Sequence, residues 1–314
     1  MHFDIVHIRD ADHIDYGVLV HTRALIYMYE CTLSETKVCG AEISGGGTGQ
    51  LTACQFERNE LGVHVTGYGS CCDAHGCIFL STQTGVSASR KGKMMLQKCH
   101  ATEAGCAYRA TSGAAMHTTE CTSKGGKIGW RADMLSTNLI AQGCLGTDAQ
   151  GPHVAGGATA DLDGCSFSGS SREVVMISSS GTFADLKGCT VSKGEPDCVR
   201  VDQGARACLI WCSVSGSGHR LRSEGCGTRV DVIDCLSENH ERVGRHCDNR
   251  SVCVVSGSRS VGNCWCGYGA AGGGHMTVTN CCSEEEVHSC RAFGGGSTMT
   301  SQRLRVDGVQ VEDF

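Results

Sequence analysis

Residues 51–77 read LTACQFERNELGVHVTGYGSCCDAHGC. Leu51 and Phe56 flank Cys54, and the segment Gly62-Val63-His64-Val65 then alternates apolar and polar side chains. Alternation with a period of two is typical of β-strands that turn one face inward. A glycine-rich turn follows, and at Cys77 the pattern starts again, 23 residues after Cys54.

This spacing recurs along the chain. Cysteines follow one another at intervals of 21 to 24 residues from position 31 to position 235, Ser258 holds the next place, and position 281 again holds a cysteine. A fixed period in the twenties indicates a solenoid in which each repeat is one coil. The eleven residues of this cysteine ladder are Cys31, Cys54, Cys77, Cys99, Cys121, Cys144, Cys165, Cys189, Cys212, Cys235 and Cys281.

Each repeat carries three strand signals. Apolar residues stand three positions before and two positions after the ladder cysteine, and a third alternating segment begins about nine positions after it. Glycine, asparagine or aspartate often precedes the cysteine, which predicts a tight left-handed bend between the first two strands. No helical periodicity is present. We therefore predict an all-β, right-handed parallel β-helix of about 12–13 coils of about 23 residues, with three short strands per coil.

The segment from Cys54 to Val65 resembles the PbH1-type repeat of the pectin-lyase-like superfamily, whose pattern is N-x-x-x-x-x-x-G-[VI]-x-[VI]. The resemblance covers about residues 20–305, and cysteine replaces the stacked inward asparagine that is frequent in that family. It implies a β-helix over residues 21–305, with residues 1–20 as an N-terminal cap or first coil and residues 306–314 as a C-terminal tail.

The cysteine ladder is expected to be structural. Equivalent residues of adjacent coils lie about 4.8 Å apart, whereas a disulfide needs a Cβ–Cβ distance of about 3.8 Å. Neighbouring ladder thiols should therefore stay reduced and pack as small apolar groups. The other cysteines do not form the two paired knuckles of a zinc site, so we expect no metal and no cofactor.

A column of basic residues about ten positions after the ladder is the first candidate site. Alternation predicts that these side chains point outward and could follow an acidic polysaccharide. The alternative is a compensated surface ladder, because Asp133, Asp202 and Glu224 stand two residues further along the same strands, and we favour it. The candidate binding residues are Arg109, Arg131, Arg200, Arg222, Arg245 and Arg291.

Carboxylates form the second candidate site. Asp161, Asp185 and Asp231 each stand four residues before a ladder cysteine, so stacking could bring them to glycosidase-like separations. The resemblance implies that enzymes of the superfamily cleave acidic polysaccharides with calcium-bound Asp clusters and an Arg base, or with paired Asp acids. Polygalacturonase motifs are absent, however, and the regular coils leave no long loops to wall a cleft. We favour turn capping for these three residues.

Composition restricts the function classes. The 314-residue chain carries 24 Cys, 44 Gly and a net charge of −6, which argues against nucleic acid and anionic membranes as partners. No export signal is recognisable at its start, so we expect a reducing, intracellular compartment or a virion. We predict a non-catalytic structural or protein-interaction solenoid that binds a protein partner or itself, by analogy with the PbH1 region of F-box-type adaptors. The alternative is a lyase or hydrolase acting on an acidic glycan.

Overall fold

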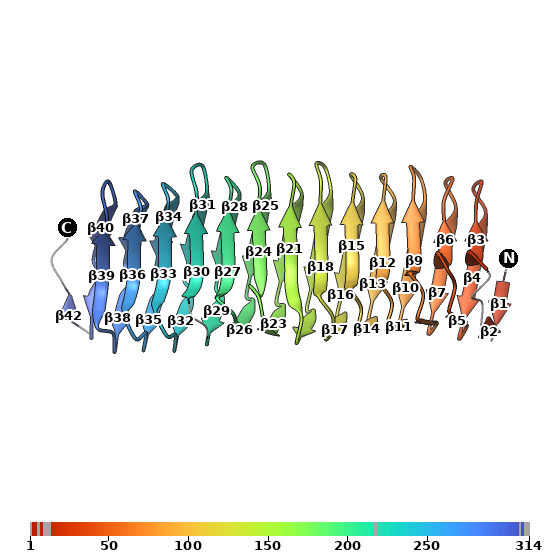
Figure 1. Cartoon of the computed structure of the whole chain (residues 1–314), viewed down its shortest axis with the longest axis horizontal. Coiled ribbons are helices and arrows are strands. Elements are labelled where there is room, and N and C mark those ends of the chain that lie inside the picture. Colours follow the sequence, from red (N-terminus) through yellow and green to blue (C-terminus); the bar gives the residue numbers. More distant parts are fainter. Residues whose placement is uncertain (1, 5–6, 9–13, 217–218, 308, 311–314) are drawn as a thin grey trace. The chain divides into compact units, whose positions relative to one another are not determined.

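The computed structural model describes residues 2–4, 7–8, 14–216, 219–307 and 309–310. These residues form an all-β parallel solenoid of about 13 turns, with three strands per coil and no helix among them (Figure 1). The chain divides into two compact units, residues 1–152 with 157–160, and residues 153–156 with 161–314. The predicted fold class is confirmed, whereas parts of the predicted cap (1–20) and tail (306–314) lie outside the described residues.

In the first unit the strands of each coil belong to three sheets, here named A, B and C. Sheet A holds β1 (His2–Asp4), β4 (Leu25–Tyr29), β7 (Thr48–Thr52), β10 (Cys71–His75), β13 (Lys93–Gln97), β16 (Ala115–Thr119) and β19 (Asn138–Gln142). Sheet B holds β2 (His7–Ile8), β5 (Thr32–Ser34), β8 (Gln55–Glu57), β11 (Ile78–Leu80), β14 (His100–Thr102), β17 (Thr122–Lys124) and β20 (Leu145–Thr147). Sheet C holds β3 (Tyr16–Val20), β6 (Cys39–Ile43), β9 (Leu61–Thr66), β12 (Thr84–Ser89), β15 (Cys106–Thr111) and β18 (Ile128–Asp133).

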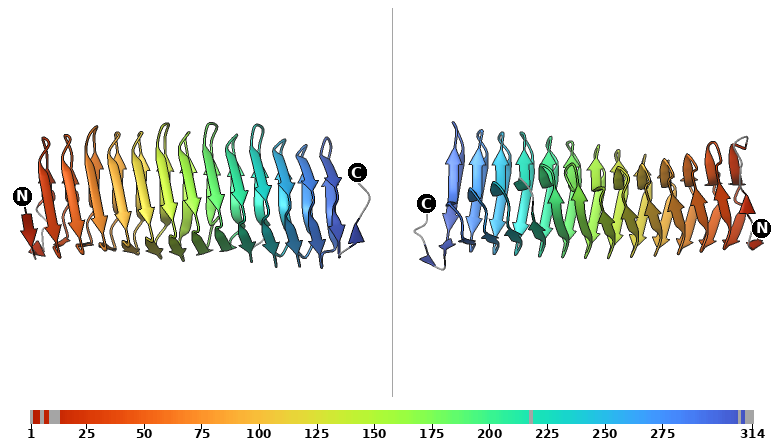
Figure 2. Two further views of the ribbon diagram at one scale, coloured as in Figure 1. Left: turned by 180° about the vertical axis from the view of Figure 1, so that it is seen from behind. Right: turned by 60° about the horizontal axis from the view of Figure 1, so that its bottom comes forward.

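The second unit repeats the arrangement (Figure 2). Its part of sheet A holds β25 (Phe183–Lys187), β28 (Arg206–Ile210), β31 (Arg229–Ile233), β34 (Val252–Ser256), β37 (His275–Thr279) and β40 (Thr298–Gln302). Sheet B holds β23 (Ser166–Ser170), β26 (Thr190–Gly194), β29 (Ser213–Ser215), β32 (Leu236–Glu238), β35 (Arg259–Val261), β38 (Cys282–Glu284), β41 (Arg305–Val306) and β42 (Val309–Gln310). Sheet C holds β24 (Val175–Ser178), β27 (Asp197–Asp202), β30 (His219–Glu224), β33 (Val243–Asp248), β36 (Cys266–Ala271) and β39 (His288–Phe293). The chain passes between the units through β21 (Gln150–Ala155) and β22 (Thr159–Asp163).

A one-residue bend joins sheet A to sheet B just before each ladder cysteine. Gly76 has a φ of +62° there, and Ala53 adopts the same left-handed conformation at +52°. Left-handed backbone is cheap for glycine and tolerated by asparagine and aspartate, and Asn280 and Asp234 stand at the equivalent bends. The predicted bend position therefore coincides with the observed one.

The ladder cysteines fill the inside of this bend, where their side chains are at most 3% exposed. All 24 cysteines of the chain are thiols and none is in a disulfide. The Cys54 thiol donates to the carbonyl oxygens of Thr52 at 3.4 Å and of Met28, one coil earlier, at 3.5 Å. Hydrogen bonds with Cys144 and Cys99, together with burial, raise the pKa of the Cys121 thiol. Thus the small thiol ties its own coil to the preceding one.

Aromatic side chains extend the interior of the first unit. Phe56 stacks on Phe79 with 5.3 Å between ring centroids, and Tyr108 lies 5.2 Å from Trp130. The Tyr108 hydroxyl lies 3.0 Å from the Cys99 carbonyl oxygen, so its polar end is satisfied although the ring is buried. Stacked rings of this kind stabilise adjacent coils beyond the area they bury.

Candidate functional site

The predicted arginine column lies on the outer face of sheet C. Arg109 is in register with Arg131 in the first unit, and Arg200 with Arg222 in the second. All four side chains are partly exposed, as the strand alternation predicts. Arg291 is also exposed on its strand, and its guanidinium lies 5.2 Å from the centre of the Trp265 ring.

Carboxylates form ion pairs with four arginines of this column, and most of these carboxylates stand two residues beyond an arginine on the same strand. Arg131 Nε lies 2.5 Å from Asp133 Oδ2, and Arg109 shares the same carboxylate at 4.0 Å. Arg200 forms three ion pairs, at 3.0 Å to Asp202, 3.2 Å to Glu173 and 3.3 Å to Glu224. Arg222 also reaches Glu224, at 3.2 Å. Carboxylates thus outnumber the two guanidinium groups in the second unit, which leaves them little net charge for an acidic ligand, whereas in the first unit two guanidinium groups share the single carboxylate of Asp133.

The prediction that Arg245 belongs to this outward column is wrong. Arg245 is in register with Leu221 and Tyr268, its side chain is 2% exposed, and His246 occupies the outward position instead. The turn between β32 and β33 contains one residue more than the turn between β29 and β30. Arg245 therefore stands ten residues after Cys235, whereas its register partner Leu221 stands nine residues after Cys212. Because side chains alternate with a period of two, one extra residue reverses the face on which each side chain lies.

A buried carboxyl underlies the arginine column of the second unit. Asp197 is fully buried, and among the described residues neither of its carboxyl oxygens has a hydrogen-bond partner. Burial raises its pKa to about 6, although Arg222 and Arg200 oppose the rise. Sequence reasoning missed this residue because its position at the start of β27 resembles an ordinary polar turn. Its burial removes it from contact with any large substrate.

The predicted aspartate column lies on the outer face of sheet A in the second unit. Asp161, Asp185 and Asp231 stand in the middle of β22, β25 and β31, so the predicted turn-capping role is wrong. Asp185 and Asp231 are separated by the strand that carries Cys208. Burial raises the pKa of Asp185, and the neighbouring Asp161 raises it further. Asp231 forms an ion pair with Arg229 at 2.9 Å.

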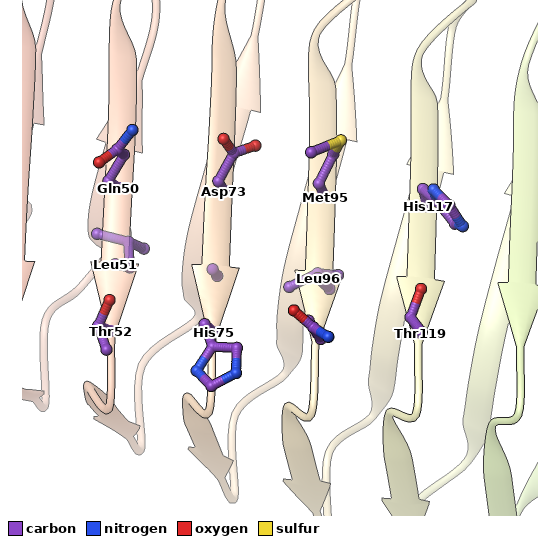
Figure 3. A pocket seen from close by; sticks show the side chains of 11 residues that line it. Gln50, Leu51, Thr52, Asp73, His75, Met95, Leu96, His117 and Thr119 are labelled. Atoms are coloured by element: carbon purple, nitrogen blue, oxygen red, sulfur yellow. The ribbon is translucent and has the colours of Figure 1, made fainter.

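The same column in the first unit holds a different set of side chains, which sequence reasoning missed. A hollow of about 410 Å³ lies over β7, β10, β13 and β16. Figure 3 shows Gln50, Asp73, Met95 and His117 in one row across these four strands. A second row contains His75. The sequence does contain a signal for Asp73. This residue stands four positions before Cys77, as the predicted aspartates stand before their ladder cysteines.

The chemistry of this hollow differs from that of the arginine column. Asp73 and His75 are exposed, and within the described residues neither side chain has a hydrogen-bond or ion-pair partner. His117 Nε2 lies 3.2 Å from Gln142 Oε1. A carboxylate and two imidazoles on one face are groups that can bind hydroxyls or transfer protons. The hollow therefore offers polar groups that are free to meet a ligand.

Neither a metal centre nor a membrane span appears in the described part of the chain. Its His, Cys, Asp and Glu side chains form no group of three or more that could hold a metal ion. Among the same residues there is no helix long and apolar enough to cross a membrane.

With the coils and their outer faces established, comparison with known proteins identifies the family. The family described as "Right handed beta helix region" matches residues 7–181, more than half of the chain. The chain belongs to this right-handed β-helix family. No curated protein matches the sequence.

Solved structures share the fold at low identity. A variant of the periplasmic alginate epimerase AlgG is 9% identical, with a TM-score of 0.60 over 92% of this chain and 78% of its own. A chain of the Vag8–C1 inhibitor complex is 11% identical, with a TM-score of 0.58 over 98% of this chain and 99% of its own. Tailspike protein 3 of bacteriophage CBA120 is 11% identical, with a TM-score of 0.54 over 90% and 56%. The β-helix fold therefore serves both enzymatic and non-catalytic roles.

Proposed function

We propose that this β-helix is a non-catalytic recognition module that presents its outer faces to a protein partner or to a second copy of itself. The regularity of the coils carries the proposal. Equivalent residues of sheet A are 22 or 23 residues apart from β4 to β19, and 23 apart from β25 to β40. Among the described residues of these ranges, no coil carries an inserted loop.

Regular coils have a chemical consequence. An enzyme needs walls that exclude water and hold a substrate against the reacting groups, and solenoids build such walls from inserted loops. Within the described part of the chain, the hollow over β10 and β13 is lined only by residues of strands β7, β10, β13 and β16. Such an open face suits binding to another protein, because protein interfaces need complementary shape and do not need an enclosed cavity.

The thiols support a reducing location for this module. Eleven ladder cysteines are buried as thiols, and a protein rich in reduced cysteine is typical of reducing compartments. We therefore propose an intracellular or virion setting. An acidic polysaccharide is a weaker partner for the arginine face, because Arg200 and Arg222 already contact carboxylates.

Site-specific photocrosslinking in cells that make the protein tests this proposal. A photoreactive residue is placed at Met95 on sheet A, at Leu135 on a turn, or at buried Leu96 as the matched control. We expect one discrete protein adduct from an exposed position and none from Leu96. Absence of an adduct from every exposed position, together with turnover of a glycan, would overturn the proposal.

One observation favours a second candidate function, an enzyme acting on a glycan. Asp73 and His75 lie in the same hollow, where neither side chain has a hydrogen-bond or ion-pair partner among the described residues, and such groups can act as general acid and base. On this reading, substitution Asp73→Asn abolishes product release from a uronate polymer. The recognition module predicts no product from either the parent chain or the variant.

A further inference from the structure

The turns that lead from sheet C to sheet A in the first unit expose large apolar side chains. Tyr68 is 86% exposed in the turn before β10, and Met134 and Leu135 are 55% and 75% exposed in the turn before β19. Exposed apolar side chains that cluster on one part of a surface often mark a site of interaction with another molecule. We name the turns at residues 67–70, 90–92, 112–114 and 134–137 the turn edge.

Three cations lie on or beside the turn edge. Arg90, Lys91 and Lys93 are all exposed, and within the described residues no carboxylate lies within ion-pair distance of any of them. This distinguishes them from Arg131 and Arg200, which contact carboxylates. The positive charge of these three groups is therefore not neutralised by an adjacent carboxylate of the described residues. Its field attracts an anionic partner.

A hollow joins the aromatic and basic groups. It measures about 480 Å³, and its lining includes Tyr68, Cys71, Lys91 and Lys93. The aliphatic stem of Lys91 runs past Gly113, where an added Cβ would lie 3.6 Å from Lys91 Cγ. The stem therefore adds apolar surface while the ammonium group stays in solvent. Asp73 is the nearest acid along β10, two residues beyond Cys71.

We propose that the turn edge binds a peptide segment of a partner protein in which acidic residues adjoin aromatic or aliphatic ones. This inference rests on the proposed function, and it names the surface and the chemistry of the partner. Carboxylates of the segment pair with Lys91 and Lys93, while its apolar side chains pack on Tyr68 and Leu135. Tyrosine and methionine are enriched in the cores of protein interfaces, whereas most lysines lie at the rim.

The composition of the edge favours a peptide over a glycan. Apart from its two lysines, the hollow is lined mainly by glycine, alanine, cysteine, serine and one tyrosine. A sugar chain needs several planar amide or carboxylate groups for its hydroxyls, and such groups lie instead in the separate hollow with Asp73 and Gln97. Exposed Met134 and Leu135 offer contacts that an apolar side chain of a peptide can use.

A displayed library of random dodecapeptides is the probe. The full chain is used for selection, and the variant Lys91→Gln/Lys93→Gln is used for counter-selection. The matched control is Lys124→Gln/Lys127→Gln, which removes the same charge from two exposed lysines, one at the end of β17 and one in the turn after it. Tyr68→Ala tests the apolar component, and circular dichroism checks that each variant is folded.

We expect enriched peptides to combine Asp or Glu with aromatic or aliphatic residues. Their affinity should fall about tenfold in the Lys91/Lys93 variant and severalfold in Tyr68→Ala, since lost charge pairs and hot-spot contacts each cost about that much. The control should stay within about twofold, and added salt should weaken binding. Enriched peptides without acids, or equal losses in the two lysine variants, would overturn the inference. Glycan turnover would instead count against the proposed function.

Discussion

The Arg245 guanidinium donates from Nη2 to the Cys235 carbonyl oxygen at 2.9 Å, inside the coil and ten residues from its acceptor. The same guanidinium carbon lies 5.4 Å from the centre of the Tyr268 ring on the next strand of sheet C. Arg245 is thus a large interior side chain that fills the volume between a ladder residue and an aromatic ring. It is not a ligand-binding residue.

Arg245 should therefore behave as a core position. We predict that Arg245→Ala lowers the free energy of unfolding by about 3 kcal/mol, because it leaves a cavity. Arg245→Met should cost much less, since an apolar side chain of similar length replaces a desolvated charge. Arg222→Ala, on the exposed face, should cost at most about 1 kcal/mol. Urea denaturation measures all three, and equal losses for Arg222→Ala and Arg245→Ala would contradict the assignment.

Asp197 should make stability depend on pH. Its pKa is raised to about 6 in the folded chain because the carboxyl is buried, whereas an unfolded aspartate titrates near 3.9. Between these values the folded state binds the extra proton, so the free energy of unfolding falls as pH rises from about 4 to about 6.

Substitution Asp197→Asn tests this dependence. The variant should gain stability relative to the parent as pH rises through that window, by on the order of 3 kcal/mol at pH 7. Asp148→Asn, at an exposed turn, serves as the control. The difference in the free energy of unfolding between this variant and the parent should be the same at both pH values. Denaturation curves at pH 4 and pH 7 provide the measurement. A constant difference between Asp197→Asn and the parent would contradict the burial of an ionisable carboxyl.

The ladder should tolerate serine better than leucine. Ser258 already holds a ladder place, where its hydroxyl accepts from the Cys235 amide and donates to the Ser256 carbonyl oxygen, both at 3.0 Å. We predict that Cys121→Ser costs less than about 1 kcal/mol. Cys121→Leu should cost about 1–3 kcal/mol because the narrow coil is overpacked. Thermal unfolding ranks the stabilities of the two variants. A leucine variant more stable than the serine variant would show that the interior of the coil can hold a larger side chain.

Thiol accessibility should separate the ladder from the surface. Cys226 and Cys264 are exposed, whereas every ladder thiol is buried. Alkylation of the native protein, followed by peptide mass spectrometry, should label Cys226 and Cys264 first and the ladder only after unfolding. In denaturant without reductant, all 24 cysteines should react. Rapid native labelling of Cys121 would place that thiol outside a packed interior.

The fold was predictable because the cysteine spacing and the alternation around Cys54 report the same coil at every repeat. The site was less predictable. Counting ten residues from Cys235 places Arg245 outside, but one extra turn residue reverses its face. The predicted aspartate column also contains residues of the second unit only, so it omits Asp73 and the neighbouring His75 of the first unit. The carboxylate partners of Arg200 depend on pairing across coils, which spacing alone resolves only in part.

A glycan turnover assay most directly tests the central claim, which is that the outer faces of this β-helix bind a partner and catalyse no reaction. The parent chain and the variant Asp73→Asn/His75→Gln are incubated with a panel of neutral and uronate polymers. Products are detected as new reducing ends, unsaturated uronates or epimerised residues. We predict that neither protein yields product above a buffer control. Product from the parent chain that disappears in the variant would contradict the account and make the hollow over β10 and β13 an active site.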